Sequence, residues 1–261
     1  MRTRIQLLTL GLLVVVTAVS CTKPIDDATG AGQGGAAAAK DAPAGAEKLR
    51  VAVVTGGHPF DVPNFYRLLR ELPGVDAYPQ HIEHFASCPD ETRDAYDAVV
   101  FYGMHRGVPD DEGPKYAGKP KAAVERLVER GQGIVVVHHA LLAWEKWDFW
   151  NQLIGFDNRN FGFKEGLNLK VEVAGGEHPI TAGLETLEIV DEGYILHGKH
   201  DGKGEVLLTV DHENAMDEVA WVRQHGKSNV FCLALGHDNQ AWGNPGFRQI
   251  LARGIAWSAG E

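Results

Sequence analysis

Short apolar runs that alternate with helical patterns place the strongest constraint on the fold of this 261-residue chain. The clearest run is Gly133–Val137, in which every residue after the glycine is β-branched and apolar. A predicted amphipathic helix over 121–130 precedes it, and mainly apolar runs also occupy 50–55 and 96–103. Strands that are apolar on both faces and alternate with helices are typical of a parallel sheet covered on both sides. The sequence therefore predicts an α/β fold.

The pattern changes after Trp150, where predicted strands follow one another with turns and few helices between them. These strands cover 167–173, 187–190, 206–210 and 219–222. We interpret them as an antiparallel extension of the parallel sheet. A buried strand over 230–235 and a closing helix over 245–258 complete the prediction, and a helix over 63–72 follows the first strand.

The N-terminal region differs in composition from the rest of the chain. Basic residues and an apolar run lead to small residues before Cys21, which predicts a secretory signal peptide over 1–20. Residues 18–21 also resemble a bacterial lipobox, so we expect a lipoprotein with its lipid on Cys21. Ordinary cleavage is the alternative. Residues 21–47 are rich in Ala, Gly, Asp and Pro and predict a disordered tether. The folded domain is then 48–261, in the cell envelope, with this lipid as its membrane anchor on the periplasmic or outer-membrane face.

Charge and cysteine content limit the partners that this domain can have. The chain carries 25 Lys and Arg against 35 Asp and Glu, a formal net charge of -10, which repels polyanions and argues against a nucleic-acid partner. The three cysteines, Cys21, Cys88 and Cys232, form no close pair, so the sequence contains neither a disulfide framework nor a cysteine-rich zinc motif. Neutral small molecules are the expected ligands.

Histidines follow four of the predicted strands. These histidines are His58, His105, the pair His138 and His139, and His237. Ligands of open α/β sheets bind at the carboxyl ends of the strands, so we expect the four loops to converge on one site. Trp242 lies close to His237 in the sequence and is the candidate sugar-stacking platform, whereas Trp144, Trp147, Phe149 and Trp150 include at least two core residues.

The turn at Val137–Ala140 resembles a nucleophile elbow in shape, because a buried strand passes sharply into a helix there. Only one of the two adjacent histidines can face the cleft comfortably. We predict that His138 does so, above the sheet, and that His139 packs into the junction between helix and sheet. A histidine in this position can act as a base, a nucleophile or a metal ligand.

Six segments together resemble the ThuA (trehalose utilisation) family. They are Gly133–His138, His178–Leu184, Asp191–Tyr194, Ala220–Arg223, Leu235–His237 and Phe247–Trp257. The resemblance implies a three-layer class I glutamine amidotransferase-like fold with a flavodoxin-like central sheet, in which His138 replaces the elbow cysteine. His237 matches the amidotransferase histidine, but Asn239 stands where an acidic partner is expected. Without the thiol and the carboxylate, glutamine hydrolysis is excluded.

The resemblance also implies a carbohydrate substrate, namely trehalose-like disaccharides handled as 3-keto sugars that a partner sugar 3-dehydrogenase makes upstream. A ketone at C3 acidifies the hydrogen on C2, so a base can form an enolate and an acid can protonate the departing glycosidic oxygen. We therefore expect an enzyme, either a hydrolase or lyase that cleaves a 3-keto-glycoside or an isomerase. The expected catalytic residues are His138, His237 and Glu192, and the expected substrate-binding residues are His58, His105, Asp191 and Trp242.

Three alternatives remain open in the sequence. Asp191 and Glu192 follow the predicted strand 187–190 and form either a solvated turn or a functional pair, with Glu192 as base or metal ligand and Asp191 bracing a histidine or backbone amides. A divalent metal could bind to His58, His138 and His237. The protein could also be a non-catalytic sugar-binding lipoprotein, although a histidine-rich cleft favours an enzyme.

Overall fold

The computed structural model describes residues 47–198 and 200–261 of the chain. The predicted signal peptide over 1–20, the predicted lipidation of Cys21 and residues 21–46 of the predicted tether lie outside the described residues. Within the described ranges, we find no helix that would span a lipid bilayer.

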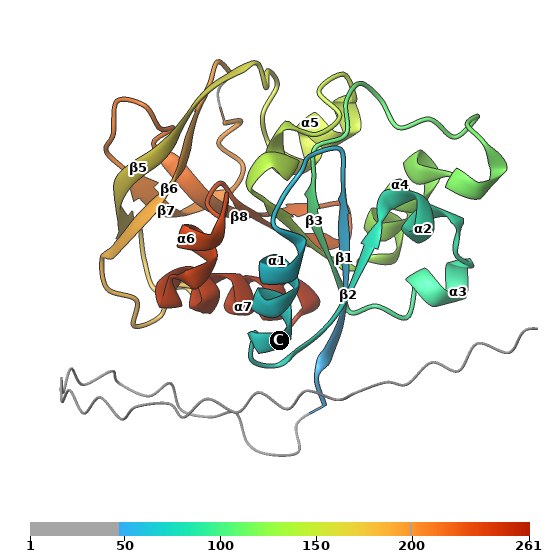
Figure 1. Ribbon diagram of the computed structural model, residues 1–261, viewed down its shortest axis with the longest axis horizontal. Coiled ribbons are helices and arrows are strands. Elements are labelled where there is room, and N and C mark those ends of the chain that lie inside the picture. The colour runs from blue at the N-terminus through green and yellow to red at the C-terminus, as the bar shows by residue number, and fades with distance from the viewer. Residues whose placement is uncertain (1–46, 199) are drawn as a thin grey trace, which may run out of the picture. The chain divides into compact units, whose positions relative to one another are not determined.

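Nine strands form one sheet within these ranges, in the order β2-β1-β3-β4-β9-β8-β7-β5-β6. The parallel half consists of β1 (Leu49–Gly56), β2 (Val75–His81), β3 (Ala98–Gly103), β4 (Gly133–Val137) and β9 (Ser228–Leu233). The antiparallel half consists of β5 (Phe161–Val173), β6 (Leu187–Leu196), β7 (Glu205–Val210) and β8 (Glu218–His225). The predicted α/β class and the antiparallel extension are confirmed (Figure 1).

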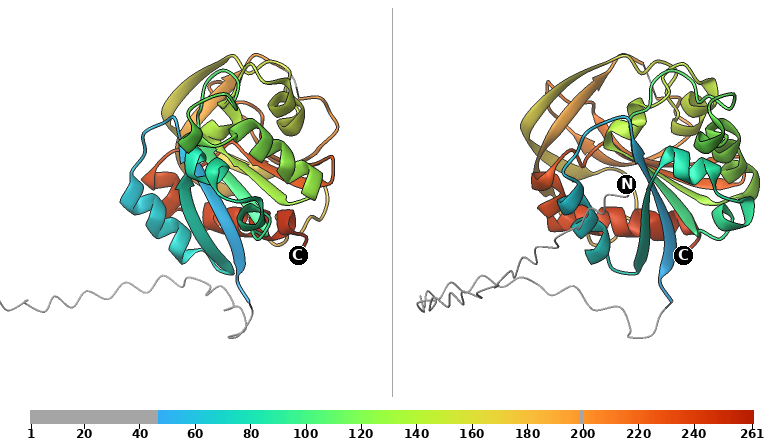
Figure 2. Two further views of the ribbon diagram at one scale, coloured as in Figure 1. Left: turned by 90° about the vertical axis from the view of Figure 1, so that its right-hand side faces the viewer. Right: turned by 45° about the vertical axis from the view of Figure 1, so that its right-hand side comes forward.

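Helices cover the parallel strands on both sides, which accounts for the apolar character of those strands on both faces. One layer contains α1 (Val62–Glu71), α6 (Asn239–Gly243) and α7 (Pro245–Ala259), and the other contains α2 (Ile82–Ser87) and α4 (Pro120–Arg130). Figure 2 shows α1 and α4 on opposite sides of the central strands. Every residue of β4 is buried between the layers. The short helices α3 (Asp90–Arg93) and α5 (Asp148–Ile154) and the 3-10 helices η1 (Lys115–Ala117) and η2 (His138–Leu142) lie in connections.

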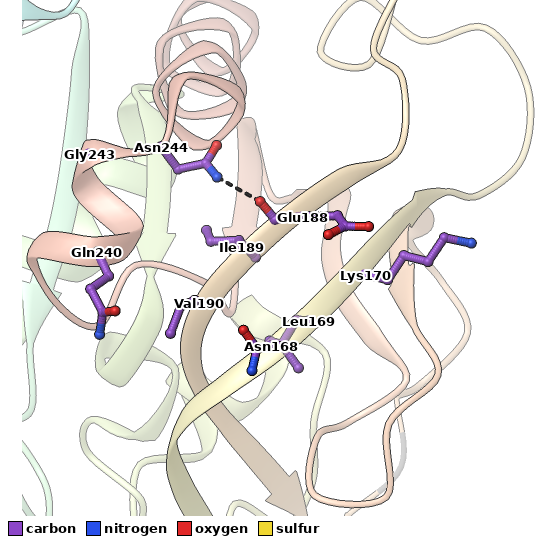
Figure 3. Close-up of a pocket in the computed structure, with 9 residues that line it drawn as sticks. All are labelled: Asn168, Leu169, Lys170, Glu188, Ile189, Val190, Gln240, Gly243 and Asn244. Carbon is purple, nitrogen blue, oxygen red and sulfur yellow. Dashed lines mark hydrogen bonds between the residues drawn. The ribbon is translucent and has the colours of Figure 1, made fainter.

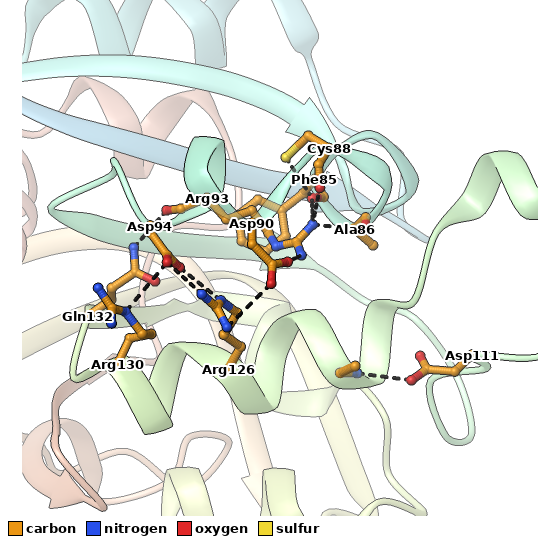
Figure 4. Close-up of polar contacts among 11 residues, drawn as sticks. Phe85, Ala86, Cys88, Asp90, Arg93, Asp94, Asp111, Arg126, Arg130 and Gln132 are labelled. Atoms are coloured by element: carbon orange, nitrogen blue, oxygen red, sulfur yellow. Dashed lines mark hydrogen bonds and ion pairs between the residues drawn. The ribbon is translucent and has the colours of Figure 1, made fainter.

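A polar network joins α4 to the segment that contains α3 (Figure 4). Arg126 of α4 donates to both carboxylate oxygens of Asp94, at 2.9 and 2.6 Å. The buried guanidinium of Arg93 donates to the carbonyl oxygens of Phe85, Ala86 and Cys88 and to the carboxylate of Asp90. Because buried carbonyl groups need donors, this network replaces hydrogen bonds that water would otherwise supply.

The structure differs from the predicted elements in two places that affect the site. The strand predicted over 187–190 continues to Leu196, so Asp191 and Glu192 lie within β6 rather than in a solvated turn. The elbow passes into the 3-10 helix η2, only five residues long. The edge strand β2, which contains Pro79, is not among the predicted strands.

Candidate active site

The turn after β4 has the predicted elbow geometry, but its first side chain is buried. His138 adopts a φ of 51°, in the left-handed region that non-glycine residues rarely occupy. Backbone conformations of this kind cost about 1–3 kcal/mol and persist only where surrounding contacts impose them. The His138 side chain is 0% exposed, so the expectation that it stands open above the sheet is wrong. Its ring points instead into a cluster of polar groups.

Three side chains from β6 and the loop after β9 converge around one ring nitrogen of His138. His138 Nε2 lies 2.7 Å from the Tyr194 hydroxyl, 3.0 Å from Glu192 Oε2 and 3.1 Å from His237 Nδ1. Glu192 Oε2 lies 3.4 Å from His237 Nδ1. On its other side, His138 Nδ1 lies 2.7 Å from the carbonyl oxygen of Ala234. We call His138, Glu192, Tyr194 and His237 the central cluster.

Exposure decides which member of the central cluster a substrate can reach. The Glu192 side chain is 6% exposed and that of His237 is 21% exposed. His237 directs Nδ1 into the cluster, so its Nε2 is the ring nitrogen that remains for a substrate. The predicted catalytic residues are therefore brought together, with His237 outermost and His138 innermost.

The pKa values of the central cluster follow from burial and from contact between opposite charges. Burial raises the pKa of the Glu192 carboxyl, but contacts with His138, His237 and Tyr194 outweigh this effect and hold the pKa well below its usual range. Contact with the Glu192 carboxylate raises the pKa of His237 against the opposing effect of burial. Burial raises the pKa of Tyr194 well above its usual value. The site thus keeps an ionised Glu192 beside His237, where its charge stabilises the imidazolium that His237 forms when it accepts a proton.

Asp191 acts on the backbone and has no surface for a substrate. Its carboxylate accepts hydrogen bonds from the backbone amides of Gly236, at 2.7 Å, and His237, at 2.9 Å. The residue is 2% exposed. This arrangement corresponds to the predicted bracing of backbone amides and corrects the prediction that Asp191 contacts the substrate. Asp191 is a positioning residue for the loop that carries His237.

His58 and His139 form a stacked pair beside the central cluster. Their ring centroids are 4.2 Å apart, and the centroid of His58 lies 6.5 Å from that of His237. His139 is 1% exposed, as expected for the residue packed into the junction, and burial lowers its pKa to about 2. Burial also lowers the pKa of the half-buried His58. His58 therefore lies at the rim of the cluster, where a substrate can touch it.

Two predicted substrate contacts lie elsewhere. The ring centroid of His105 lies 5.7 Å from that of Trp144, on which it stacks, and 5.6 Å from that of His81. These three residues line a cavity of about 290 Å³ that no member of the central cluster lines. The predicted convergence of four histidine-bearing loops thus holds for His58, His138 and His237 but not for His105. Trp242 is 3% exposed and donates its indole N–H to the Gly236 carbonyl at 2.8 Å. It is a core residue that supports the His237 loop, so the prediction of a sugar-stacking platform is wrong.

Sequence reasoning missed Tyr194, although it was part of the motif Asp191–Tyr194. Because the predicted strand ends at Val190, the two-residue spacing of Glu192 and Tyr194 does not predict that their side chains share a face. Residues i and i+2 of a strand point to the same face. Had the strand been extended, this alternation would have placed both side chains together.

The cavity that adjoins β6 does not contain the central cluster. It has a volume of about 500 Å³ and is lined by Asn168, Leu169, Lys170, Glu188, Ile189, Val190, Gln240, Gly243 and Asn244 (Figure 3). Glu188 and Val190 precede Glu192 on the same strand, and Gln240 follows His237 by three residues. The cavity therefore lies along β6, which supplies Glu192 and Tyr194, and beside α6, which follows the loop that carries His237.

A metal ion could be held by His138, Glu192 and His237, whose ligand atoms all lie within 4.8 Å of one another. This set differs from the one predicted from the sequence. Glu192 takes the place of His58, whose ring is 6.5 Å from that of His237 and stacks on His139 instead. Two imidazoles and one carboxylate are a donor set that suits Zn²⁺ and other first-row divalent ions.

Comparisons with solved structures identify the same fold in other proteins. A ThuA-like protein from Parabacteroides merdae is 18% identical, with a TM-score of 0.65 and coverage of 82% of this chain and 91% of that chain. A ThuA-like protein from Bacteroides uniformis is 18% identical, with a TM-score of 0.62 and coverage of 85% and 95%. A Thermoplasma acidophilum protein described as part of a GMP synthase is 15% identical, with a TM-score of 0.50 and coverage of 82% and 96%.

The sequence comparison agrees with the structural one. None of the curated proteins matches the chain. A family model described as trehalose utilisation matches residues 78–258, which is well over half of the chain and includes every member of the central cluster. The fold is that of class I glutamine amidotransferase-like proteins. The chain belongs to the ThuA (trehalose utilisation) family.

Proposed function

We propose that this protein is an enzyme that cleaves or isomerises a 3-keto-glycoside, such as a trehalose-like disaccharide oxidised at C3. The family description supports carbohydrate as the substrate class. The observation that carries the proposal is the pairing of the partly exposed His237 with the buried Glu192, 3.4 Å apart. Such a pair can take a proton from a carbon acid and stabilise the imidazolium that forms.

The proposed reaction begins with transfer of the C2 proton to His237 Nε2. The electron pair of the broken C2–H bond forms the C2–C3 double bond of an enolate, and the ketone oxygen takes the negative charge. In cleavage, this charge returns through C2 to form a C1–C2 double bond while the C1–O bond breaks. The leaving oxygen then takes a proton from His237 or from the neighbouring His58. In isomerisation, the enolate is protonated again instead.

The buried members of the cluster prepare His237 for this role. Glu192 keeps a negative charge beside Nδ1, and His138, which also contacts the Tyr194 hydroxyl, holds the carboxylate in place. His138 is a positioning residue here, because its 0% exposure leaves no surface for the substrate. This role replaces direct catalysis by His138 as expected from the sequence.

A panel of disaccharides tests the proposal. The full chain is incubated with native and 3-keto disaccharides, and the products are identified by mass spectrometry. We expect conversion of a 3-keto substrate and a loss of at least about 100-fold in kcat/KM for His237→Gln, the size of a lost general base. His105→Gln is the matched control, because it removes an imidazole outside the central cluster, and it should retain activity. Tight binding of these sugars without turnover would instead indicate a sugar-binding lipoprotein.

We further propose that the chain is a lipoprotein of the cell envelope, anchored through Cys21. The support is the lipobox-like sequence before Cys21 and the signal-peptide pattern over 1–20. Radiolabelled palmitate should label the full chain but not its Cys21→Ala variant. Equal labelling of both would contradict the proposal.

We also propose that a sugar 3-dehydrogenase acts upstream of this protein, because a glycoside acquires its C3 ketone by oxidation.

A further inference from the structure

The contacts of His138 Nε2 exceed what one proton can satisfy. The carbonyl oxygen of Ala234 accepts a hydrogen bond from Nδ1, so a proton resides on that nitrogen. Nε2 then carries a lone pair or a single proton. It faces three heteroatoms within 3.1 Å, those of Tyr194, Glu192 and His237. The Tyr194 hydroxyl has its own proton to donate, but Glu192 Oε2 and His237 Nδ1 can each offer a further lone pair at this point, and a cation can interact with several electron pairs at once.

The distances between the carboxylate oxygen and the two imidazole nitrogens match those between ligand atoms around one metal ion. The separations between His138 Nε2, Glu192 Oε2 and His237 Nδ1 are 3.0, 3.1 and 3.4 Å. Ligands about 2.0–2.2 Å from a metal ion, at angles between octahedral and tetrahedral values, are roughly 2.8–3.6 Å apart. A point about 2 Å from all three atoms therefore exists just outside the plane of their triangle.

We propose that His138 Nε2, Glu192 Oε2 and His237 Nδ1 bind one divalent transition-metal ion. Zn²⁺ is the ion used to test this proposal. Two imidazole nitrogens and one carboxylate oxygen are the ligands of many catalytic zinc sites and of facial non-haem iron sites. His58, at the rim, is outside this set. The proposal concerns binding alone and does not depend on which sugar is converted.

The groups behind the ligands support the same assignment. Metal-binding histidines commonly donate their second N–H to a backbone carbonyl, which is what His138 does with Ala234 at 2.7 Å. Asp191 fixes the backbone of Gly236 and His237, and so fixes the position of the third ligand. These contacts hold the ligand atoms in place before any ion binds, which lowers the entropic cost of binding.

A bound ion is compatible with the proposed function. It would supply positive charge beside the negative oxygen that develops on an enolate. An imidazole that binds a metal through Nδ1 carries its proton on Nε2, so His237 could then protonate the leaving oxygen but could not remove the C2 proton. His58, outside the ligand set, would be the imidazole left to remove it.

Calorimetric titration with ZnCl2 tests the proposal on the full chain, purified without a metal column and treated with chelator. We expect one ion per chain and a Kd below about 1 μM, a modest affinity for a preformed three-ligand zinc site. Glu192→Gln should weaken binding by at least about 100-fold, because it removes the charged ligand. His105→Gln, the matched control outside the site, should leave the Kd unchanged.

A second variant keeps the test decisive if Glu192→Gln does not fold. His237→Gln changes the most exposed ligand, and circular dichroism shows whether it is folded. Zn²⁺ should raise the Tm of the wild-type chain, since an ion that binds only the folded state stabilises it, and should not raise the Tm of the folded variant. A wild-type chain that binds no Zn²⁺, or variants that bind it as tightly as wild type, would overturn the proposal. Because no sugar is present, failure here leaves the turnover test unaffected.

Discussion

Asp191 shows how one residue can control a site without touching its ligand. Its carboxylate accepts three backbone N–H groups, from Glu192, Gly236 and His237. Gly236 adopts a φ of 113°, and a Cβ at this position would lie 2.8 Å from the Phe247 ring. The loop before His237 is therefore confined by a hydrogen-bonded carboxylate on one side and by close packing on the other.

We predict that Asp191→Asn destabilises the protein and displaces His237. An amide has one oxygen and one nitrogen, so its NH2 group would face a backbone N–H that now donates to a carboxylate oxygen. An unsatisfied buried donor costs about 1–3 kcal/mol, which urea denaturation would detect as a lower free energy of unfolding. Turnover should fall with it. Glu188→Gln, which changes an exposed side chain of the same strand, is the control and should change neither quantity.

We predict that buried His139 makes stability fall in acid. Its pKa is about 2 in the folded state, against an ordinary value of 6.5. As the pH decreases below 6.5, the unfolded chain binds a proton at this residue that the folded chain does not. The free energy of unfolding should then decrease by about 1.4 kcal/mol per pH unit from this group alone.

His139→Phe tests this prediction, because it keeps an aromatic ring without a titratable group. Urea denaturation between pH 7 and pH 4, in the presence of chelator, should give a shallower dependence on pH for the variant. Above pH 7 the free energy of unfolding should change with pH equally in the two proteins. The same slope for both proteins below pH 6 would show that His139 does not contribute.

At the level of elements, the sequence predicts those strands whose composition follows from burial on two faces. The bounds of β4 are predicted correctly, because all of its residues are buried and all but Gly133 are β-branched. The end of β6 is not, because charged Asp191 and Glu192 interrupt its apolar pattern. Their side chains are buried against partners distant in the sequence, and only the tertiary structure supplies those partners. β2 is missed because an edge strand tolerates Pro79 and polar residues.

We predict that Arg93→Met destabilises the packing of α2 and α3. Arg93 is 7% exposed and supplies donors to the carbonyl oxygens of Phe85, Ala86 and Cys88. Methionine fills a similar space but leaves these acceptors without a donor. The expected cost is about 2–4 kcal/mol, measured by urea denaturation. Arg130→Met is the matched control, since its side chain is 57% exposed, and equal effects of the two changes would contradict the prediction.

For the whole molecule, the sheet curvature that assembles the central cluster is the feature that the sequence does not reveal. His58, His138 and His237 follow parallel strands, so their approach is predictable from topology. β6, however, is five strands away from β4 in the sheet order. In a flat sheet the two would be roughly 24 Å apart, at about 4.8 Å per strand. The 3.0 Å contact between His138 and Glu192 therefore requires the antiparallel half to curl back over the strand ends.

The family and fold do not by themselves specify the chemistry of the central cluster. The family match and the similar structures establish the family and the fold, while the central cluster supports a particular chemistry. The chemistry needs its own test, one that detects removal of the C2 proton whether the product arises by cleavage or by isomerisation.

Exchange of the C2 hydrogen for solvent deuterium is that test. The full chain is incubated with a 3-keto-glycoside in D2O, and deuterium at C2 of the substrate and product is measured by NMR. We predict that wild type incorporates deuterium at C2 far faster than the uncatalysed solution, and that His237→Gln loses this ability while His105→Gln keeps it. Product formation that leaves the original hydrogen on C2, or exchange that is as fast in His237→Gln as in wild type, would contradict the proposed role of the central cluster.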